Sequence, residues 1–357
     1  MYNQKNLPNQ RALNTPAYHP PVAGRRAGSG ETRSDWLLDF NEWPVPEDLS
    51  VTDTQPNAYP EYGTTLLDGI ATNIGVTPEQ IVLANGSDRA LDLVFRVFTT
   101  PEKPGEVILP TPSYAMYDVY TAQAGVKEVR VSFMQPGQEY SEEAIQDAVT
   151  KDTEMIVLCN PNSPTGSLLS KESIARIAGE NPTVTILIDE AYSEFSGVSS
   201  VDQIAEFPNI IVTRTFSKAW GLASIRLGYT VSSQEAADVL RRNASPYDIP
   251  QLSYQIAAAR IGQGGLVKAR AEEVMNRSKP MVEDFFRENG VPFIEGSAAN
   301  FVLIQPPKFK KVYEKLAQAG FRVRIQDKPG IEGSLRVTIG PVSLMEKFME
   351  TYRQVVL

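Results

Sequence analysis

The chain of 357 residues has very few of the residues that form disulfides and metal centres. Cys159 is its single cysteine and His19 its single histidine, which excludes an intrachain disulfide, a multi-cysteine metal site and a histidine cluster. It also lacks an apolar run near the roughly 18 residues that cross a bilayer, and its first residues lack the apolar core of a signal peptide. We therefore expect a cytoplasmic protein with no metal and no membrane partner.

Positive charge is also scarce. The chain has 34 lysine and arginine residues against 43 aspartate and glutamate residues, a net charge of -9, and no basic block of the kind that binds a phosphate backbone. We expect no nucleic-acid partner. Its 42% hydrophobic and 22% charged residues are typical of a globular protein. Because 357 residues exceed what one core usually organises, we predict a larger and a smaller domain.

Residues 53–250 show the pattern of an α/β domain. Short β-branched runs alternate with helical patterns such as 88–98 and 170–180. The predicted strands are 80–83, 106–109, 128–133, 154–159, 183–189 and 209–213. This alternation predicts a mostly parallel sheet that helices cover on both faces.

The two ends of the chain differ from this central part. Residues 1–35 are polar and rich in proline, glycine and arginine, which predicts an extended arm. After Pro250 come two long helical stretches, apolar segments at 299–305 and 334–340, and a helix near 344–356, which indicate a smaller α+β unit. The predicted domains are an N-terminal arm (1–35), a small α+β domain (36–52 and 251–357) and a large α/β domain (53–250).

The segment TRTFSKAWGLASIRLGY (213–229) places Lys218 just after a predicted strand. Ligands of doubly wound sheets bind at the carboxyl ends of the strands. A lysine there, next to Ser217 and eight residues before Arg226, suits a cofactor that carries an aldehyde and a phosphate. An ordinary surface lysine is the alternative.

Asp189 ends the apolar strand TVTILI and is expected to be buried. A buried carboxylate needs a cationic partner, and a protonated pyridine nitrogen is one. The charged ring would act as the electron sink that stabilises a carbanion at the Cα of an amino acid. Tyr192 could donate a hydrogen bond to a phenolic oxygen on the same ring. A helix cap is the alternative for Asp189.

Two further segments follow predicted strands. In LANGSDRAL (83–91), a turn of small residues opens a helix, so the backbone N–H groups of Gly86, Ser87 and Asp88 could bind a phosphate; a plain helix cap is the alternative. NPNSPTG (160–166) predicts an irregular loop, which could be a simple turn. Since all these features follow strands of one predicted sheet, a single ligand could contact all of them.

Ten motifs in order along the chain carry a family resemblance. They are FNEWP (40–44), AYPEYG (58–63), NGSDRAL (85–91), PTPSYAMYDVY (110–120), NPNSPTG (160–166), DEAYSEF (189–195), RTFSKAWGLASIRLGY (214–229), SPYDIP (245–250), ANFVLI (299–304) and GSLRVTIG (333–340). With these motifs the chain resembles the pyridoxal 5′-phosphate (PLP) enzymes of fold type I, and among them the histidinol-phosphate aminotransferases. The resemblance implies a large domain with a mostly parallel sheet, a smaller α+β domain and an N-terminal arm.

The resemblance also implies roles for residues around the cofactor. Lys218 would hold PLP as a Schiff base and move the proton at the substrate Cα. Asp189 would face the pyridine nitrogen, Tyr192 the phenolic oxygen, and Tyr114 would stack on the ring. The other residues expected to contact the cofactor are Gly86, Ser87, Asp88, Asn162, Ser163, Ser217, Arg226 and, from a neighbouring subunit, Tyr59. The role of Tyr59 implies a homodimer with shared active sites.

For the substrate, the resemblance implies that Arg336 binds an anionic group and that Arg324 binds a phosphate, with Tyr18 closing over it. Asn41 and Tyr59 are also expected at the substrate. Two arginines suit a dianion better than a lone carboxylate. The implied reaction is ping-pong amino transfer between histidinol phosphate and 2-oxoglutarate, so the partners are a small amino donor and a keto acceptor.

The sequence is also compatible with other functions. The same scaffold could decarboxylate a phosphorylated amino acid, transaminate an aromatic or specialised metabolite, or serve as a catalytically dead binding protein. Arg324 could be a solvated charge while Arg336 alone binds a carboxylate. The sequence departs from the family pattern at three positions: Ser163 replaces the usual asparagine before Pro-Thr-Gly, Ala58 a frequent arginine, and Arg89 a common acidic residue.

Overall fold

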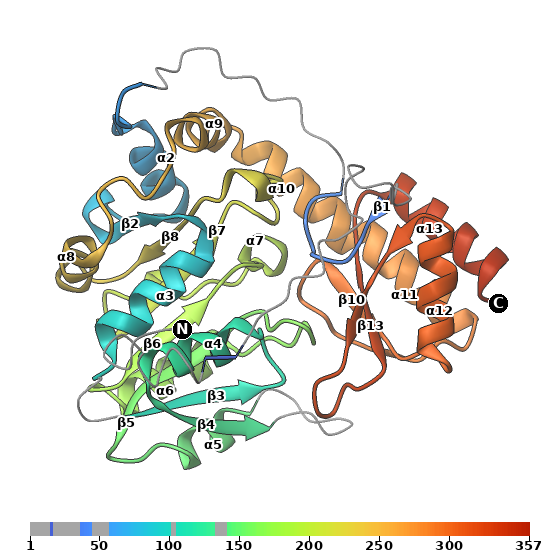
Figure 1. The fold of residues 1–357 in the computed structure, drawn as a ribbon, viewed down its shortest axis with the longest axis horizontal. Coiled ribbons are helices and arrows are strands. Elements are labelled where there is room, and N and C mark those ends of the chain that lie inside the picture. Colours follow the sequence, from blue (N-terminus) through green and yellow to red (C-terminus); the bar gives the residue numbers. More distant parts are fainter. Residues whose placement is uncertain (1–14, 17–35, 45–56, 101–104, 133–140) are drawn as a thin grey trace, which may run out of the picture.

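The structure is a computed structural model that describes residues 15–16, 36–44, 57–100, 105–132 and 141–357. It has a larger lobe around a seven-stranded sheet and a smaller lobe around a four-stranded sheet (Figure 1). The predicted arm, including Tyr18, lies almost entirely outside the described residues. Among the described residues, no helix has the length and apolar character that a membrane crossing needs.

The seven-stranded sheet confirms the predicted α/β class. Its strands are β2 (Ile81–Ala84), β3 (Glu106–Thr111), β4 (Lys127–Ser132), β5 (Thr153–Cys159), β6 (Thr185–Asp189), β7 (Ile210–Thr215) and β8 (Gly228–Val231). They follow the order β2-β8-β7-β6-β5-β3-β4, in which β8 runs antiparallel to β2 and β7 and the other neighbours are parallel. The carboxyl ends of β5, β6 and β7 therefore meet at one edge, as the motifs require.

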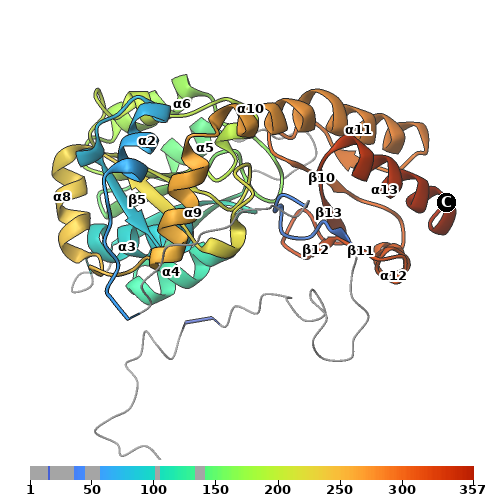
Figure 2. The same cartoon turned by 90° about the horizontal axis from the view of Figure 1, so that it is seen from above.

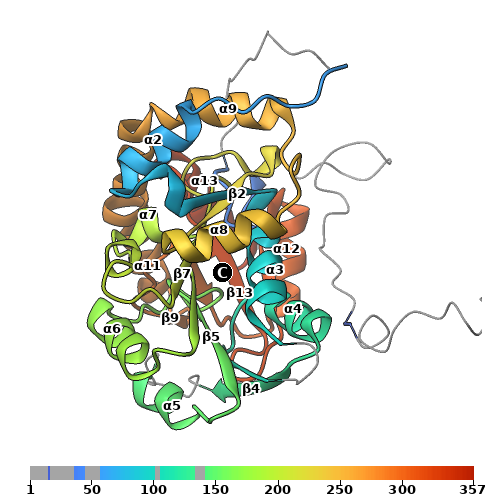
Figure 3. The ribbon, with the colours of Figure 1, turned by 90° about the vertical axis from the view of Figure 1, so that its left-hand side faces the viewer.

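Helices cover both faces of this sheet because its apolar residues alternate between the faces. In β5, Ile156 packs into one core and Val157 into the other. The covering helices include α3 (Gly86–Phe98), α4 (Met116–Ala124), α5 (Glu142–Asp147), α6 (Lys171–Glu180) and α8 (Gln234–Asn243). Figure 3 shows α3, α4 and α8 on one side of the sheet and α5 and α6 on the other.

The rest of the larger lobe consists of shorter elements. They are α2 (Thr65–Ile74), α7 (Ser193–Ser196) and the 3₁₀ turns η2 (Pro78–Gln80), η3 (Val201–Gln203) and η4 (Ala223–Ile225). Helix α9 (Gln251–Ile261) packs beside α2, as Figures 1 and 3 both show. The predicted division of the chain at residue 250 assigns α9 to the small domain, and the domain bounds stay a prediction.

The smaller lobe combines the C-terminal part of the chain with residues 36–44. Its antiparallel sheet has the order β12-β13-β10-β9, and β1 pairs with β11 in parallel. These strands are β1 (Trp36–Leu37), β9 (Phe293–Ile294), β10 (Phe301–Ile304), β11 (Phe321–Arg322), β12 (Arg324–Gln326) and β13 (Ser334–Thr338). Helices α12 (Phe309–Gln318) and α13 (Val342–Val355) pack beside them.

A long helical segment joins the lobes. Helix α10 (Gly264–Glu273) continues through a π-helical turn (Val274–Ser278) into α11 (Lys279–Glu288), which runs into the smaller lobe (Figure 2). The lobes also meet at the sheet edge where β5, β6 and β7 end, and this is where the predicted site residues gather.

Candidate active site

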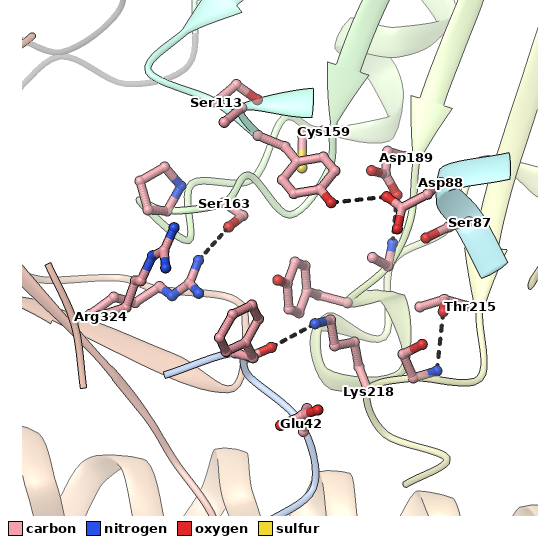
Figure 4. A pocket seen from close by; sticks show the side chains of 18 of the residues that line it. Glu42, Ser87, Asp88, Ser113, Cys159, Ser163, Asp189, Thr215, Lys218 and Arg324 are labelled. Carbon is pink, nitrogen blue, oxygen red and sulfur yellow. Dashed lines mark hydrogen bonds between the residues drawn. The ribbon is translucent and has the colours of Figure 1, made fainter. Parts of the chain in front are cut away.

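A cavity of about 520 Å³ lies between the lobes at the carboxyl ends of the parallel strands. Figure 4 shows it from close by, with side chains from both lobes around it. The predicted site residues that line it are Ser87, Asp88, Tyr114, Ser163, Asp189, Tyr192, Ser217, Lys218, Arg226, Arg324 and Arg336. Residues more than 200 positions apart in the sequence therefore meet in one cavity.

Lys218 lies half-buried in the loop after β7. Its Nζ donates a hydrogen bond to the carbonyl oxygen of Phe40 at 2.7 Å and lies 5.8 Å from the centroid of the Tyr192 ring. Phe40 belongs to the segment that packs on the smaller lobe, so the lysine spans the cavity. A neutral carbonyl holds the amine without an ion pair, which leaves it able to turn toward a bound ligand.

Asp189 is 4% exposed at the end of β6. Its carboxylate accepts hydrogen bonds from the Tyr117 hydroxyl at 2.9 Å, the Ala191 backbone N–H at 3.2 Å and the Thr213 hydroxyl at 3.4 Å. Burial raises the pKa of Asp189 to about 6, against the effect of the hydrogen bond from Tyr117. Within the described part of the chain no cation forms an ion pair with this carboxylate. A protonated pyridine nitrogen would supply the missing charge.

Tyr192 and Asn41 form a pair beside Lys218. Asn41 is fully buried, and its Nδ2 donates to the Tyr192 hydroxyl at 3.0 Å. Thr338 fixes Asn41 through two hydrogen bonds of 3.0 Å, one to its side chain and one from its backbone N–H. Since the Tyr192 oxygen accepts from Asn41, its own O–H can donate to a ligand. Asn41 itself does not line the cavity, so the structure places it behind Tyr192.

The start of α3 and the Arg226 side chain form a cradle for an anion. Helix α3 begins at Gly86 after Asn85, whose side chain forms no capping hydrogen bond, so Ser87 and Asp88 lie inside the first turn and neither is the N-cap that was the alternative. Gly86 has a φ of 77°, a backbone conformation that favours glycine, and the Arg226 guanidinium lies so close that a Cβ atom there would be 2.5 Å from Nη2. Arg226 Nη1 also lies 3.4 Å from Ser217 Oγ, and Nη2 pairs with Asp88 at 3.3 Å.

Arg226 adopts a left-handed backbone conformation with φ of 51°. Such a conformation is costly for a residue other than glycine, by roughly 1–2 kcal/mol. Strain of this kind concentrates at functional sites, where the surrounding structure holds it in place. The backbone thus aims the guanidinium into the cradle.

The loop 160–166 contributes to the cavity in a different way from the one expected. The Asn162 amide is fully buried and does not line the cavity, because it donates to the Pro112 carbonyl at 2.9 Å and the Thr165 hydroxyl at 2.7 Å and accepts from Ser113. Ser163 does line it, and its hydroxyl accepts a hydrogen bond from Arg336 Nη1 at 2.9 Å. The loop is therefore more than a turn, and Ser163 contacts an arginine of the smaller lobe.

Arg324 and Arg336 are direct neighbours across β12 and β13. Arg336 Nη2 also donates to the Asp39 carbonyl at 2.9 Å, and the Arg324 guanidinium lies 5.6 Å from the Phe40 ring centroid. Like charges directly opposite each other destabilise a sheet unless something neutralises them. Two arginines that face one cavity in this register therefore suit an anion, and preferably a dianion.

Tyr59 is 76% exposed and stacks on Tyr247 with 4.6 Å between ring centroids, away from the cavity of its own chain. Tyr18 lies outside the described residues.

Sequence reasoning missed several residues around the cavity. Tyr117 and Thr213 bind Asp189, and the Phe40 carbonyl binds Lys218. Gln326 and Lys328 line the cavity beside Arg324. The two-residue spacing from Arg324 could have revealed Gln326, because alternate residues of a strand share a face, whereas Lys328 lies in the bend after the strand. Among the described residues, no cluster of acidic residues, histidine or cysteine could hold a metal ion.

Comparison with known proteins identifies the family. The sequence profile of aminotransferase class I and II matches residues 48–351. The histidinol-phosphate aminotransferase of Caldanaerobacter subterraneus is 34% identical over 331 residues, which cover 90% of this chain and 93% of the relative. That of Christiangramia forsetii is 35% identical over 321 residues, 89% of each chain.

Solved structures share the fold. The histidinol-phosphate aminotransferase of Sinorhizobium meliloti, in complex with pyridoxal-5′-phosphate, matches with a TM-score of 0.80 at 21% identity, over 97% of this chain and 98% of the other. The L-threonine-O-3-phosphate decarboxylase of Porphyromonas gingivalis matches with a TM-score of 0.72 at 20% identity, over 84% of this chain and 90% of the other. With a profile that spans most of its length and relatives above 30% identity, the chain belongs to the class I and II aminotransferases and is a PLP-dependent aminotransferase of fold type I.

Proposed function

We propose that this enzyme transfers an amino group between histidinol phosphate and 2-oxoglutarate. The observation that carries the proposal is the pair Arg324 and Arg336, which face one cavity with Lys218. The names of the relatives with 34% and 35% identity support the same substrate. A phosphate monoester is a dianion near neutral pH, and two guanidinium groups match it better than they match a single carboxylate.

The cofactor contacts that we propose follow the layout of the cavity. Asp189 would hold the ring nitrogen, Tyr192 the phenolic oxygen, and Tyr114 one face of the ring. The backbone N–H groups at the start of α3, with Ser217 and Arg226, would hold the phosphate. When bound, PLP supplies an aldehyde that condenses with amines and a charged ring that withdraws electrons from the substrate Cα.

The position of Lys218 supports its role in proton transfer. In Figure 4 it lies between Arg324 on one side and Ser87 and Asp88 on the other. A substrate whose phosphate reaches the arginines would thus bring its Cα toward the lysine. Once its amine is released, Lys218 Nζ would take the proton from Cα, acting as the general base. Its hydrogen bond to the Phe40 carbonyl would keep Nζ at this point of the cavity.

We also infer that the enzyme is a homodimer whose subunits share their active sites. Tyr59 and Tyr247 form a stacked pair on the surface, and Leu252 at the start of α9 is exposed as well. Large apolar side chains gathered on a surface favour an interface. In this arrangement Tyr59 would reach the cofactor phosphate of the partner subunit.

The test of the substrate compares histidinol phosphate with histidinol as amino donors, with 2-oxoglutarate as acceptor and glutamate formation as the readout. A phosphate held by charge-assisted hydrogen bonds predicts a kcat/KM at least about tenfold higher for histidinol phosphate. A preference for unphosphorylated amino acids, or release of carbon dioxide from a phosphorylated amino acid, would contradict the proposal.

A further inference from the structure

The strand that carries Arg324 brings a third basic residue to the cavity. Arg324 and Gln326 are the ends of β12, and Lys328 follows two residues later. All three line the same cavity: Arg324 and Gln326 share one face of the strand, and Lys328 lies in the bend that follows it. Lys328 therefore adds a cation to the wall that holds the arginine pair.

Lys328 reaches across from the smaller lobe to the larger one. Its Nζ donates a hydrogen bond of 2.6 Å to the carbonyl oxygen of Ser113, the residue before Tyr114. An ammonium group has three N–H donors, and this carbonyl uses one of them. The bond to Ser113 thus fixes the ammonium at the cavity wall and leaves donor capacity for a ligand.

The surroundings of Lys328 do not neutralise its charge fully. Burial lowers the pKa of Lys328, although Asp118 and Glu128 act in the opposite direction. These two acids are already paired with Arg130, at 3.2 and 2.6 Å, and in the described part of the chain no acidic side chain forms an ion pair with Lys328. Lys328 is partly buried, and an ammonium that is partly withdrawn from water without a counterion is costly, so the site favours a bound anion.

We propose that Lys328 is a third cationic ligand of the substrate phosphate, beside Arg324 and Arg336, and that it helps the enzyme to select a dianion over a carboxylate. The inference rests on the proposed function and names a residue that determines its specificity. Lys328 would balance the second negative charge of the phosphate, and a substrate without the phosphate lacks that charge. Its removal should therefore affect phosphorylated ligands selectively.

The competing explanation is that Lys328 only fastens the Ser113 backbone and thereby positions Tyr114. Three variants separate the two explanations. Lys328→Met removes charge and donor, Lys328→Gln keeps an N–H donor without the charge, and Lys328→Arg keeps the charge. Lys311→Met, an exposed lysine in α12 of the same lobe, is the matched control.

Two measurements on the PLP-loaded enzyme test the proposal. Calorimetric titration with inorganic phosphate should show binding at least about tenfold weaker in Lys328→Met and Lys328→Gln than in the wild type and in Lys311→Met. The ratio of kcat/KM for histidinol phosphate to that for histidinol should fall by a similar factor, and Lys328→Arg should recover most of it. The absorption spectrum of the bound cofactor should stay unchanged.

Equal losses for both substrates with unchanged phosphate binding would overturn the inference and assign Lys328 to positioning. If Lys328→Met does not fold or bind PLP, Lys328→Gln, which also lacks the charge, distinguishes the two explanations in its place. The proposed function fails separately, when the wild type itself shows no preference for histidinol phosphate. The inference alone fails when the wild type prefers the phosphorylated substrate and the uncharged variants keep that preference.

Discussion

Replacing Asp189 with asparagine removes a buried carboxylate but keeps its shape and most of its hydrogen bonds. The Ala191 N–H and the Thr213 hydroxyl can still donate to the amide oxygen, and the Tyr117 hydroxyl can accept from the amide nitrogen. The substitution therefore isolates the charge. We expect opposite effects on the cofactor-free and the PLP-loaded protein.

The size of the expected change in folding stability follows from the pKa of Asp189. Burial raises it from the usual 3.8 to about 6 in the folded chain without cofactor. At about 1.36 kcal/mol for each pH unit, ionising this buried group costs about 3 kcal/mol of folding stability. Above pH 6 the folded chain carries the full cost, whereas below about pH 4 the carboxyl is protonated in both the folded and the unfolded chain.

Cofactor-free Asp189→Asn should therefore be more stable than the wild type above pH 6, by up to about 3 kcal/mol. The difference should shrink to zero as the pH falls from 6 toward 4. Urea unfolding followed by tryptophan fluorescence at a series of pH values measures it. The exposed Asp202→Asn, which loses only a surface ion pair with Lys171, is the control and should change stability by less than about 1 kcal/mol.

In the PLP-loaded protein the wild type should be more stable than Asp189→Asn, because the carboxylate gains the charged pyridine nitrogen as its partner. PLP should raise the unfolding midpoint of the wild type more than that of Asp189→Asn. Asp189→Asn should also remove the hydrogen from the substrate Cα more slowly than the wild type does. A cofactor-free variant that is less stable than the wild type at pH 7.5, or a stability difference that does not depend on pH, would refute this reasoning.

Three further predictions concern the other ends of the cavity. Arg226→Gln should weaken binding of PLP by about tenfold or more, while binding of pyridoxal, which lacks the phosphate, should change little in an absorbance titration. Arg324→Ala should lower kcat/KM for histidinol phosphate by about ten- to a hundredfold more than for histidinol, and Tyr18→Phe should show a smaller loss with the same selectivity. Equal losses for both substrates would instead favour the alternative in which Arg336 alone binds a carboxylate. Inactive Lys218→Ala and Tyr59→Ala proteins should regain activity when mixed, through hybrid dimers with one intact site, and a monomer in light scattering would exclude this.

The sequence predicted the fold class because its strands are buried on both faces and appear as continuous apolar runs. Six of the seven strands of the large sheet were predicted within about two residues. The exception is β8, whose four residues follow a segment rich in glycine and alanine and run antiparallel to β7. Its pairing with β2 joins residues about 150 positions apart, which local patterns do not encode.

The site was predictable where a residue follows directly from the end of a strand. Asp189 ends one strand and Lys218 follows the adjacent parallel strand, so topology alone brings them together. The direction of a side chain was not predictable. Asn162 turns into its own loop and Asn41 lies behind Tyr192, and both orientations depend on hydrogen bonds to residues distant in the sequence.

The central claim is that Lys218 carries the cofactor, and a direct chemical test exists for it. Borohydride reduces the carbon–nitrogen double bond between PLP and a lysine to a stable single bond, so peptide mapping by mass spectrometry finds the modified lysine. The test is demanding because Lys328 lines the same cavity. We predict that the label appears on the peptide that contains Lys218 and is absent from Lys218→Ala. A label on Lys328, or one that persists in Lys218→Ala, would contradict the account.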